Sequence, residues 1–152
     1  MPRTLTALAV AVAAAFSAPL PALAADEARL EANKKVVVEF YEAAINQKDF
    51  EAASKFMGDT YIQHNPLAAD GPEGLETYLA FLRENHPDAR SEIKRVFAED
   101  DHVILHVHAV RDPGERGSAI VDIFRLEDGK VVEHWDVIQP IPEQAANDNG
   151  MC

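Results

Sequence analysis

The sequence predicts an α+β fold: a curved, mostly antiparallel sheet of about four main strands, wrapped around a pocket that three N-terminal helices cover. Two observations lead to this prediction. Apolar residues recur with helical spacing as far as Pro87, and beyond it they alternate with polar residues at a period of two. Because the helices come first and the links between successive strands are short, an antiparallel meander is favoured over alternating α/β units.

Three helices are expected in the first half of the chain. The first spans 28–47, where the apolar residues share one face. A short second helix over 49–58 starts at an aspartate that can serve as its N-cap and stops at a glycine. The third begins at Asp70, with Glu73 three residues later in a capping-box arrangement. It ends before Pro87, because the residue that precedes a proline resists helical geometry.

Four segments in the second half alternate as strands do. They are 92–99, 102–111, 117–126 and 130–139. Asp128-Gly129 predicts a tight hairpin between the last two strands. The polar stretch 61–66, which lies between the second and third helices, is expected to be a loop at the mouth of the pocket.

The N-terminus reads as an export signal. Residues 1–24 combine a basic start at Arg3, a short apolar run and a small-residue cleavage site. The run is shorter than the ~20 residues that cross a bilayer, which favours cleavage over the alternative, a retained N-terminal anchor. No membrane association is expected after cleavage. The protein is therefore expected to be secreted, most simply into a bacterial periplasm. The domain would then span 25–142, and 143–152 would form an irregular polar tail.

Composition limits the partners. The 152 residues carry 14 Lys and Arg against 26 Asp and Glu, a formal charge of −12, and 47% are hydrophobic. This apolar content is enough for one packed core, while the negative charge argues against nucleic-acid and anionic-membrane partners. No glycine-rich phosphate loop and no Gly-x-Ser-x-Gly motif is present, so neither nucleotide binding nor serine hydrolysis has support.

Two strands place carboxylates and a histidine where apolar residues are expected. Asp122 alternates with apolar residues such as Phe124, so its carboxylate should be paired, neutral or both. It is either a general acid/base with a raised pKa or a structural carboxylate held by a buried partner, and spacing does not decide between them. His134 and Asp136 lie two residues apart on the last strand, so the carboxylate can orient the imidazole, unless the two form a rim ion pair.

A second group of histidines lies on another strand. His106 and His108, two residues apart, can reach one point, which is also the geometry of a metal-binding pair. The alternative is hydrogen bonding within a half-buried sheet. No Cys-x-x-Cys or His-Glu-x-x-His motif supports the metal reading. Within 61–66, the side chains of Tyr61, His64 and Asn65 are the ones expected at the pocket mouth.

Three segments together resemble a known family. Residues 61–66 (Tyr-Ile-Gln-His-Asn-Pro), 121–125 (Val-Asp-Ile-Phe-Arg) and 128–137 (Asp-Gly-Lys-Val-Val-Glu-His-Trp-Asp-Val) are similar to SnoaL-like proteins of the nuclear-transport-factor-2-like (NTF2-like) superfamily. The resemblance extends over 30–142. It implies the cone fold and, in the enzymes of the superfamily, cofactor-free acid/base chemistry in a deep apolar pocket. Polyketide cyclases, ketosteroid isomerases, scytalone dehydratases and epoxide hydrolases are such enzymes, whereas other members only bind ligands or partners.

The resemblance also implies roles for residues. The acid/base aspartate of the polyketide cyclases matches Asp122 or Asp136, and His64, His108 and His134 would hydrogen-bond a substrate carbonyl or enolate. The expected catalytic set is Asp122, His134, Asp136 and His64, and the expected substrate-binding set is Tyr61, Asn65, His106, His108, Phe124 and Trp135. For Trp135, packing is the alternative.

The expected function is that of a lyase or isomerase that needs no cofactor and acts on a small apolar carbonyl compound. Two alternatives remain open: a ligand-binding module with the same pocket, and a metal-dependent enzyme built on His106 and His108. A homodimer is expected through the outer face of the sheet, where Val131, Trp135 and Val137 would be exposed.

Overall fold

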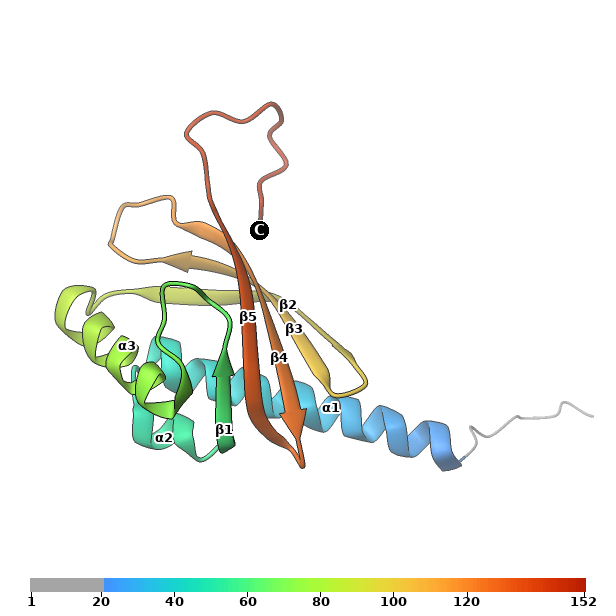
Figure 1. Cartoon of the computed structure of the whole chain (residues 1–152). Helices are drawn as coiled ribbons and strands as arrows, with labels where there is room; N and C mark the ends of the chain where they lie inside the picture. Colours follow the sequence, from blue (N-terminus) through green and yellow to red (C-terminus); the bar gives the residue numbers. More distant parts are fainter. Residues whose placement is uncertain (1–20) are drawn as a thin grey trace, which may run out of the picture.

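The computed structural model describes residues 21–152 and places the helices on one side of a curved sheet (Figure 1). In chain order the elements are α1 (Pro21–Tyr41), its π-helical continuation η1 (Glu42–Asn46), α2 (Phe50–Ser54), β1 (Met57–Gln63), α3 (Gly71–Asn85), β2 (Arg90–Glu99), β3 (His102–Val110), β4 (Ser118–Glu127) and β5 (Lys130–Pro140). The predicted α+β class and the four-stranded meander of β2 to β5 are confirmed, but the helices do not all precede the strands, because β1 lies between α2 and α3.

A fifth strand is the main addition to the predicted fold. The sheet order is β1-β5-β4-β3-β2, and β1 pairs in parallel with β5 at the sheet edge. The prediction of helix and loop over this segment was wrong. This strand could not be predicted from the sequence, because its buried and exposed residues do not alternate and its pairing register with β5 shifts between Met57 and Ile62. Gly58 allows the close approach to β5, since a Cβ there would lie 2.7 Å from Val132 Cγ1.

The structure contains the predicted hairpin turn and the predicted N-cap of α2, but not the predicted capping box of α3. Asp128 (φ 49°) and Gly129 (φ 72°) both have positive φ, as a tight two-residue hairpin requires. The Asp49 carboxylate accepts from the Ala52 N–H at 3.0 Å and so caps α2. The capping box predicted at Asp70 is wrong. Its carboxylate instead accepts from the Gln63 N–H at 2.8 Å and ties the start of α3 to the end of β1.

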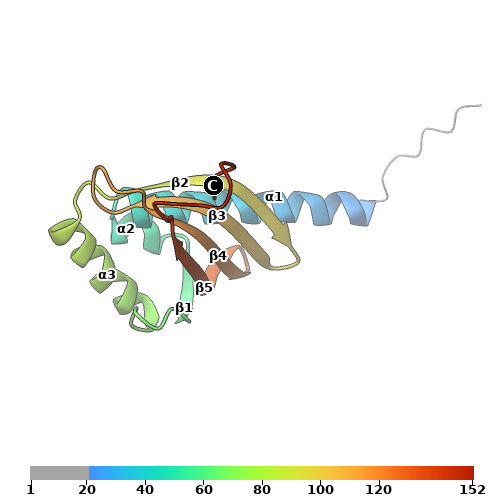
Figure 2. The same cartoon turned by 90° about the horizontal axis from the view of Figure 1, so that it is seen from above.

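The core lies between the helices and the inner face of the sheet. Seen from the front and from above, α1 runs behind the strands and α3 flanks them (Figures 1 and 2). Phe40 of α1, Leu79 of α3, Leu105 of β3 and Phe124 of β4 are almost completely buried there. Burying each such side chain contributes about 1.5–3 kcal/mol. This packing fixes the faces of β4 and β5 that carry the candidate site.

The outer face of the sheet differs from expectation at one residue. Val137 is 68% exposed on this face, but Val131 is fully buried in the core. A register shift between Arg125 and Leu126 puts Leu126 opposite Val131, so the alternation slips there and Val131 turns inward. The homodimer stays a prediction, and a monomer in sedimentation at micromolar concentration would contradict it.

The two ends of the chain bear on the remaining boundary predictions. Most of the predicted signal lies outside the described residues, although α1 runs through the predicted cleavage point and residues 23–29 are exposed. Within residues 21–152, no helix is both long and apolar enough to cross a membrane. After β5 the tail rises and curls back (Figure 1), with the Ile141 N–H donating to the Gly117 carbonyl at 3.0 Å.

Candidate active site

A cavity of about 670 Å³ lies between the concave face of the sheet and the helices, as the sequence predicted. The loop from β3 to β4 and the start of the tail complete its rim. This volume falls within the range of small-molecule sites, which are typically concave, mostly apolar and provided with a few convergent polar groups. The apolar part of the wall includes Phe40, Ala44, Ile45, Leu75, Leu82, Ile120 and Phe124.

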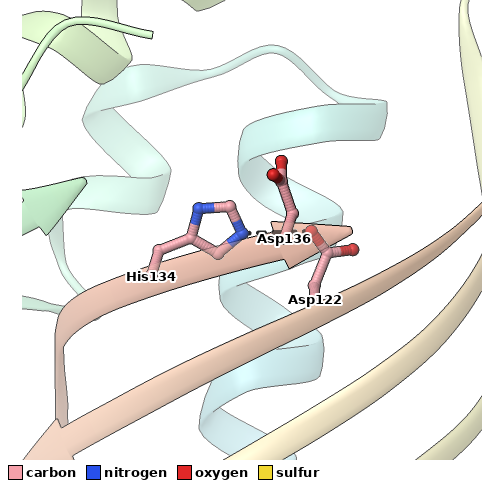
Figure 3. A group of neighbouring side chains, drawn as sticks. All are labelled: Asp122, His134 and Asp136. Atoms are coloured by element: carbon pink, nitrogen blue, oxygen red, sulfur yellow. Dashed lines mark hydrogen bonds and ion pairs between the residues drawn. The ribbon is translucent and has the colours of Figure 1, made fainter. Parts of the chain in front are cut away.

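Three polar side chains converge on this cavity from two neighbouring strands (Figure 3). In the antiparallel β4–β5 pair, Asp122 is opposite Asp136, and Phe124 is opposite His134. Because side chains alternate between faces, all four project to the inner side. The His134 Nε2 atom lies 3.0 Å from Asp122 Oδ1, and one ligand atom from each of Asp122, His134 and Asp136 lies within 4.8 Å of the others.

The contacts of His134 indicate which of its ring nitrogens donates a hydrogen bond. Its Nδ1 lies 3.1 Å from Gln63 Oε1, and the same oxygen accepts from the Asn65 N–H at 2.8 Å. Since the backbone donor fixes the orientation of the Gln63 amide, Nδ1 of His134 must donate to it. The contact between Nε2 and Asp122 Oδ1 then needs a proton of its own, either on the carboxyl or on the imidazole. We therefore expect Asp122 and His134 to share one proton.

The environment of Asp122 shifts the pKa of its carboxyl group. It is 5% exposed, and its Oδ2 has no hydrogen-bond partner among the described residues. Burial raises the pKa of Asp122, an effect that the hydrogen bond and charge of His134 oppose and the charge of Asp136 reinforces. A carboxyl group whose pKa is moved toward neutrality is suited to take up and return a proton.

The end of β1 supplies the support for this cluster. The Asn65 side-chain amide donates to Asp136 Oδ2 at 2.6 Å, and Gln63 holds both His134 and the Asn65 backbone. Tyr61, on the same strand, stacks nearly parallel to the His134 ring with centroids 6.5 Å apart. Tyr61 and Asn65 were predicted from the polar stretch. Gln63 was missed, although it belongs to that stretch.

Three tyrosines, Tyr41, Tyr61 and Tyr78, also line the cavity. Burial, with a smaller contribution from the Asp122 charge, raises the pKa of Tyr41 and of Tyr61. Burial likewise raises the pKa of Tyr78. All three phenols therefore stay protonated and can donate hydrogen bonds to an oxygen in the cavity. Tyr41 and Tyr78 were not among the predicted site residues, because they fall on the apolar faces of α1 and α3, where the spacing indicates packing in the core.

Two predicted residues lie together on the outer face of the sheet. His64 Nε2 lies 2.9 Å from Glu133 Oε1, and its side chain is 40% exposed. It stacks on Trp135 with ring centroids 4.6 Å apart and a 7° interplanar angle. Neither residue lines the cavity. Gln63 is paired with His134 in the parallel ladder, so its neighbour His64 projects to the opposite side.

The two histidines of β3 also lie outside the cavity. They alternate with the buried Val107, which places them on the outer face. His106 Nδ1 lies 2.7 Å from an Arg95 guanidinium nitrogen, and His108 Nε2 lies 2.8 Å from the Arg116 carbonyl. A guanidinium beside His106 disfavours a metal cation there. Among residues 21–152, the group that could hold a metal ion is instead Asp122, His134 and Asp136.

The comparisons identify the class of protein that this fold and site define. The family model for the SnoaL-like domain matches residues 37–134. The chain therefore belongs to the SnoaL-like family, within the NTF2-like superfamily, and the resemblance seen in the sequence is confirmed. No functionally curated protein matches the sequence.

Solved structures extend this likeness in three dimensions. AclR from Streptomyces galilaeus, a proposed hydroxylase, is 25% identical with a TM-score of 0.61, covering 73% of this chain and 81% of that one. TsrD from Streptomyces laurentii is 20% identical with a TM-score of 0.61, covering 71% and 88%. A proposed polyketide cyclase from Bacillus cereus ATCC 10987 is 20% identical with a TM-score of 0.61, covering 70% and 74%. At these identities the matches establish the shared fold.

Proposed function

We propose that this protein is a lyase or isomerase that works without a cofactor and moves a proton next to the carbonyl group of a small, largely apolar compound. The observation that carries the proposal is the buried Asp122 carboxyl in the cavity wall, with one oxygen paired to His134 and the other without a partner. The structural neighbour described as a proposed polyketide cyclase supports the same class of chemistry.

In the proposed reaction, Asp122 Oδ2 accepts a proton from the carbon beside the substrate carbonyl. The electrons of the broken C–H bond form the enolate double bond, and negative charge moves to the carbonyl oxygen. Hydroxyl groups of Tyr41, Tyr61 and Tyr78 are the donors available to that oxygen. Asp122 then returns the proton to another carbon in an isomerisation, or to a departing oxygen in an elimination. His134 stays hydrogen-bonded to Oδ1 throughout and holds the carboxyl in place.

Hydrogen exchange in D₂O tests this proposal without knowledge of the natural substrate. A panel of enolisable aryl and alicyclic ketones is incubated with the protein, and loss of the α-proton signals is followed by ¹H NMR. We expect exchange faster than in buffer for at least one ketone, and no acceleration by Asp122→Asn. Acceleration by that variant equal to wild type would contradict the proposal.

Two further outcomes of this experiment point to the alternatives. Ketones that bind in calorimetry but never exchange would favour the ligand-binding module. Exchange that is lost after dialysis against EDTA and restored by a divalent cation would assign a metal to Asp122, His134 and Asp136, whose ligand atoms already converge.

We also propose that the protein is exported and acts in the periplasm. Support comes from the signal-like composition of residues 1–24 and from the exposure of residues 23–29, so cleavage after residue 24 would leave the buried residues of α1 in place. Intact-mass analysis of the protein from an envelope fraction should give a chain that begins at Ala25. A full-length chain in the cytoplasmic fraction would contradict export.

A further inference from the structure

Three arginines line the cavity in a protein that is otherwise strongly acidic. Arg90, Arg111 and Arg116 belong to the wall, and all three are exposed residues at its rim. The whole chain has only 14 basic residues against 26 acidic ones. Within residues 21–152, none of these three guanidinium groups forms an ion pair with a carboxylate, whereas Arg29 and Arg125 both do. Their charge is therefore available to a molecule in the cavity.

The topology gathers the three arginines at one end of the sheet. Arg90 begins β2 opposite Val110, the last residue of β3, and Arg111 follows directly. Arg116 lies two residues before the start of β4. Glu115 and Glu143 line the same part of the cavity, but neither comes within 4.0 Å of a guanidinium nitrogen.

One of the arginines is linked to the interior of the site. Burial raises the pKa of Tyr78, the nearby Arg111 guanidinium opposes that rise, and the charges of Asp122 and Asp136 reinforce it. Along β4, Asp122 is four residues from Ser118, or about 13 Å. The cavity thus has an acid/base cluster along its wall, an apolar middle and a cationic rim at one end.

We propose that the substrate carries a carboxylate, which the rim formed by Arg90, Arg111 and Arg116 binds while the carbonyl group lies beside Asp122. This inference rests on the proposed function and names the class of substrate: an elongated, apolar keto acid. A guanidinium group presents a planar fork of donors that matches a carboxylate, so it fixes orientation as well as affinity. The rim also offsets the repulsion that an anion would meet in approaching a protein with a formal charge of −12.

A matched pair of fluorescent probes tests the rim directly. 4-(1-Pyrenyl)butanoate and 4-(1-pyrenyl)butanol share an apolar body and differ in the carboxylate. We expect the wild-type protein to bind the acid at least about tenfold more tightly than the alcohol. Arg111→Gln should weaken acid binding, and the triple change R90Q/R111Q/R116Q should abolish the preference while affinity for the alcohol stays within about twofold. Arg29→Gln is the control, because it removes the same charge from the exposed part of α1, outside the cavity.

Several outcomes would overturn this inference. Equal affinity for acid and alcohol in the wild type would remove the carboxylate site but leave the proposed proton transfer standing, because ketone exchange is measured separately. Equal weakening of acid binding in Arg29→Gln and Arg111→Gln would reduce the effect to overall charge. Tighter binding of 4-(1-pyrenyl)butyl phosphate than of the acid would replace the carboxylate with a phosphate. Failure of both pyrene probes to bind would contradict an apolar ligand cavity, and the proposed function with it.

Discussion

Asp122→Asn is expected to abolish proton transfer and, at neutral pH, to make the folded protein more stable than wild type. Asparagine has nearly the same shape, and its amide can donate to His134 Nε2, so the contact between the strands is kept. The variant cannot accept the substrate proton, and loss of a general base lowers rates by about 10²–10⁴-fold. The ketone-exchange assay measures the rate, and thermal unfolding measures the stability.

The stability advantage of Asp122→Asn over the wild type should increase as the pH rises. Burial raises the pKa of Asp122 above its value in the unfolded chain, so the folded state disfavours the ionised form. The wild type therefore loses stability as the pH rises through this raised pKa, whereas asparagine does not titrate. The melting temperature of the variant should match wild type most closely below about pH 4, where the carboxyl is protonated in both states. Its advantage should grow as the pH rises. A variant that becomes less stable than wild type with rising pH would contradict a buried, desolvated carboxyl.

Asp136→Asn is the matched control for this experiment. It removes the same charge from the same cavity, but Asp136 is less buried and its carboxylate already accepts from Asn65. We expect it to retain proton transfer to a larger extent than Asp122→Asn. The reverse order, with exchange abolished only in Asp136→Asn, would move the base to Asp136.

His134→Phe should give the second large effect, a loss of about 1–3 kcal/mol in the free energy of unfolding together with loss of proton transfer. The phenyl ring can pack against Phe124, whose ring centroid lies 4.7 Å from that of His134. It cannot hydrogen-bond to Asp122, so a buried carboxyl is left without a partner. Urea denaturation of the wild type and the variant at neutral pH measures the loss.

The double variant Asp122→Leu/His134→Phe separates this cause from a simple packing defect. It replaces both polar partners with apolar groups, which removes the buried unsatisfied carboxyl, so we expect it to recover part of the stability that His134→Phe loses. The single variant Asp122→Leu completes the cycle. If the stability changes of Asp122→Leu and His134→Phe merely add in the double variant, the hydrogen bond between Asp122 and His134 contributes no coupling and the account of the pair is wrong.

The part of the site that was predictable depends on regular strand alternation. Asp122 sits among apolar neighbours of β4, and His134 and Asp136 share one face of β5. A period of two therefore places all three on the inner side once the direction of the core is known. Pairing of sequential strands then brings Asp122 opposite Asp136, as the short hairpin implied.

The residues that were misplaced lie where alternation breaks or where the strand itself was not recognised. Without β1, nothing in the sequence decided between Gln63 and His64 as the inward residue, and a shift of one position exchanges the two faces. Val131 points into the core because of a register shift between β4 and β5, and no residue type in the sequence predicts that shift. The rim arginines come from a strand end and a loop, so only the three-dimensional structure brings them together.

The central claim is that Asp122 and His134 share one proton, with Nδ1 of His134 held as a donor by Gln63. ¹⁵N NMR of the His134 ring at neutral pH tests it most directly. In the wild type we expect a covalently attached hydrogen on Nδ1. In Asp122→Asn we expect that Nε2 carries no hydrogen and accepts a hydrogen bond from the new amide. A wild-type ring protonated only at Nε2, with a bare Nδ1, would show that Asp122 is an ordinary ionised acceptor, and it would contradict the account.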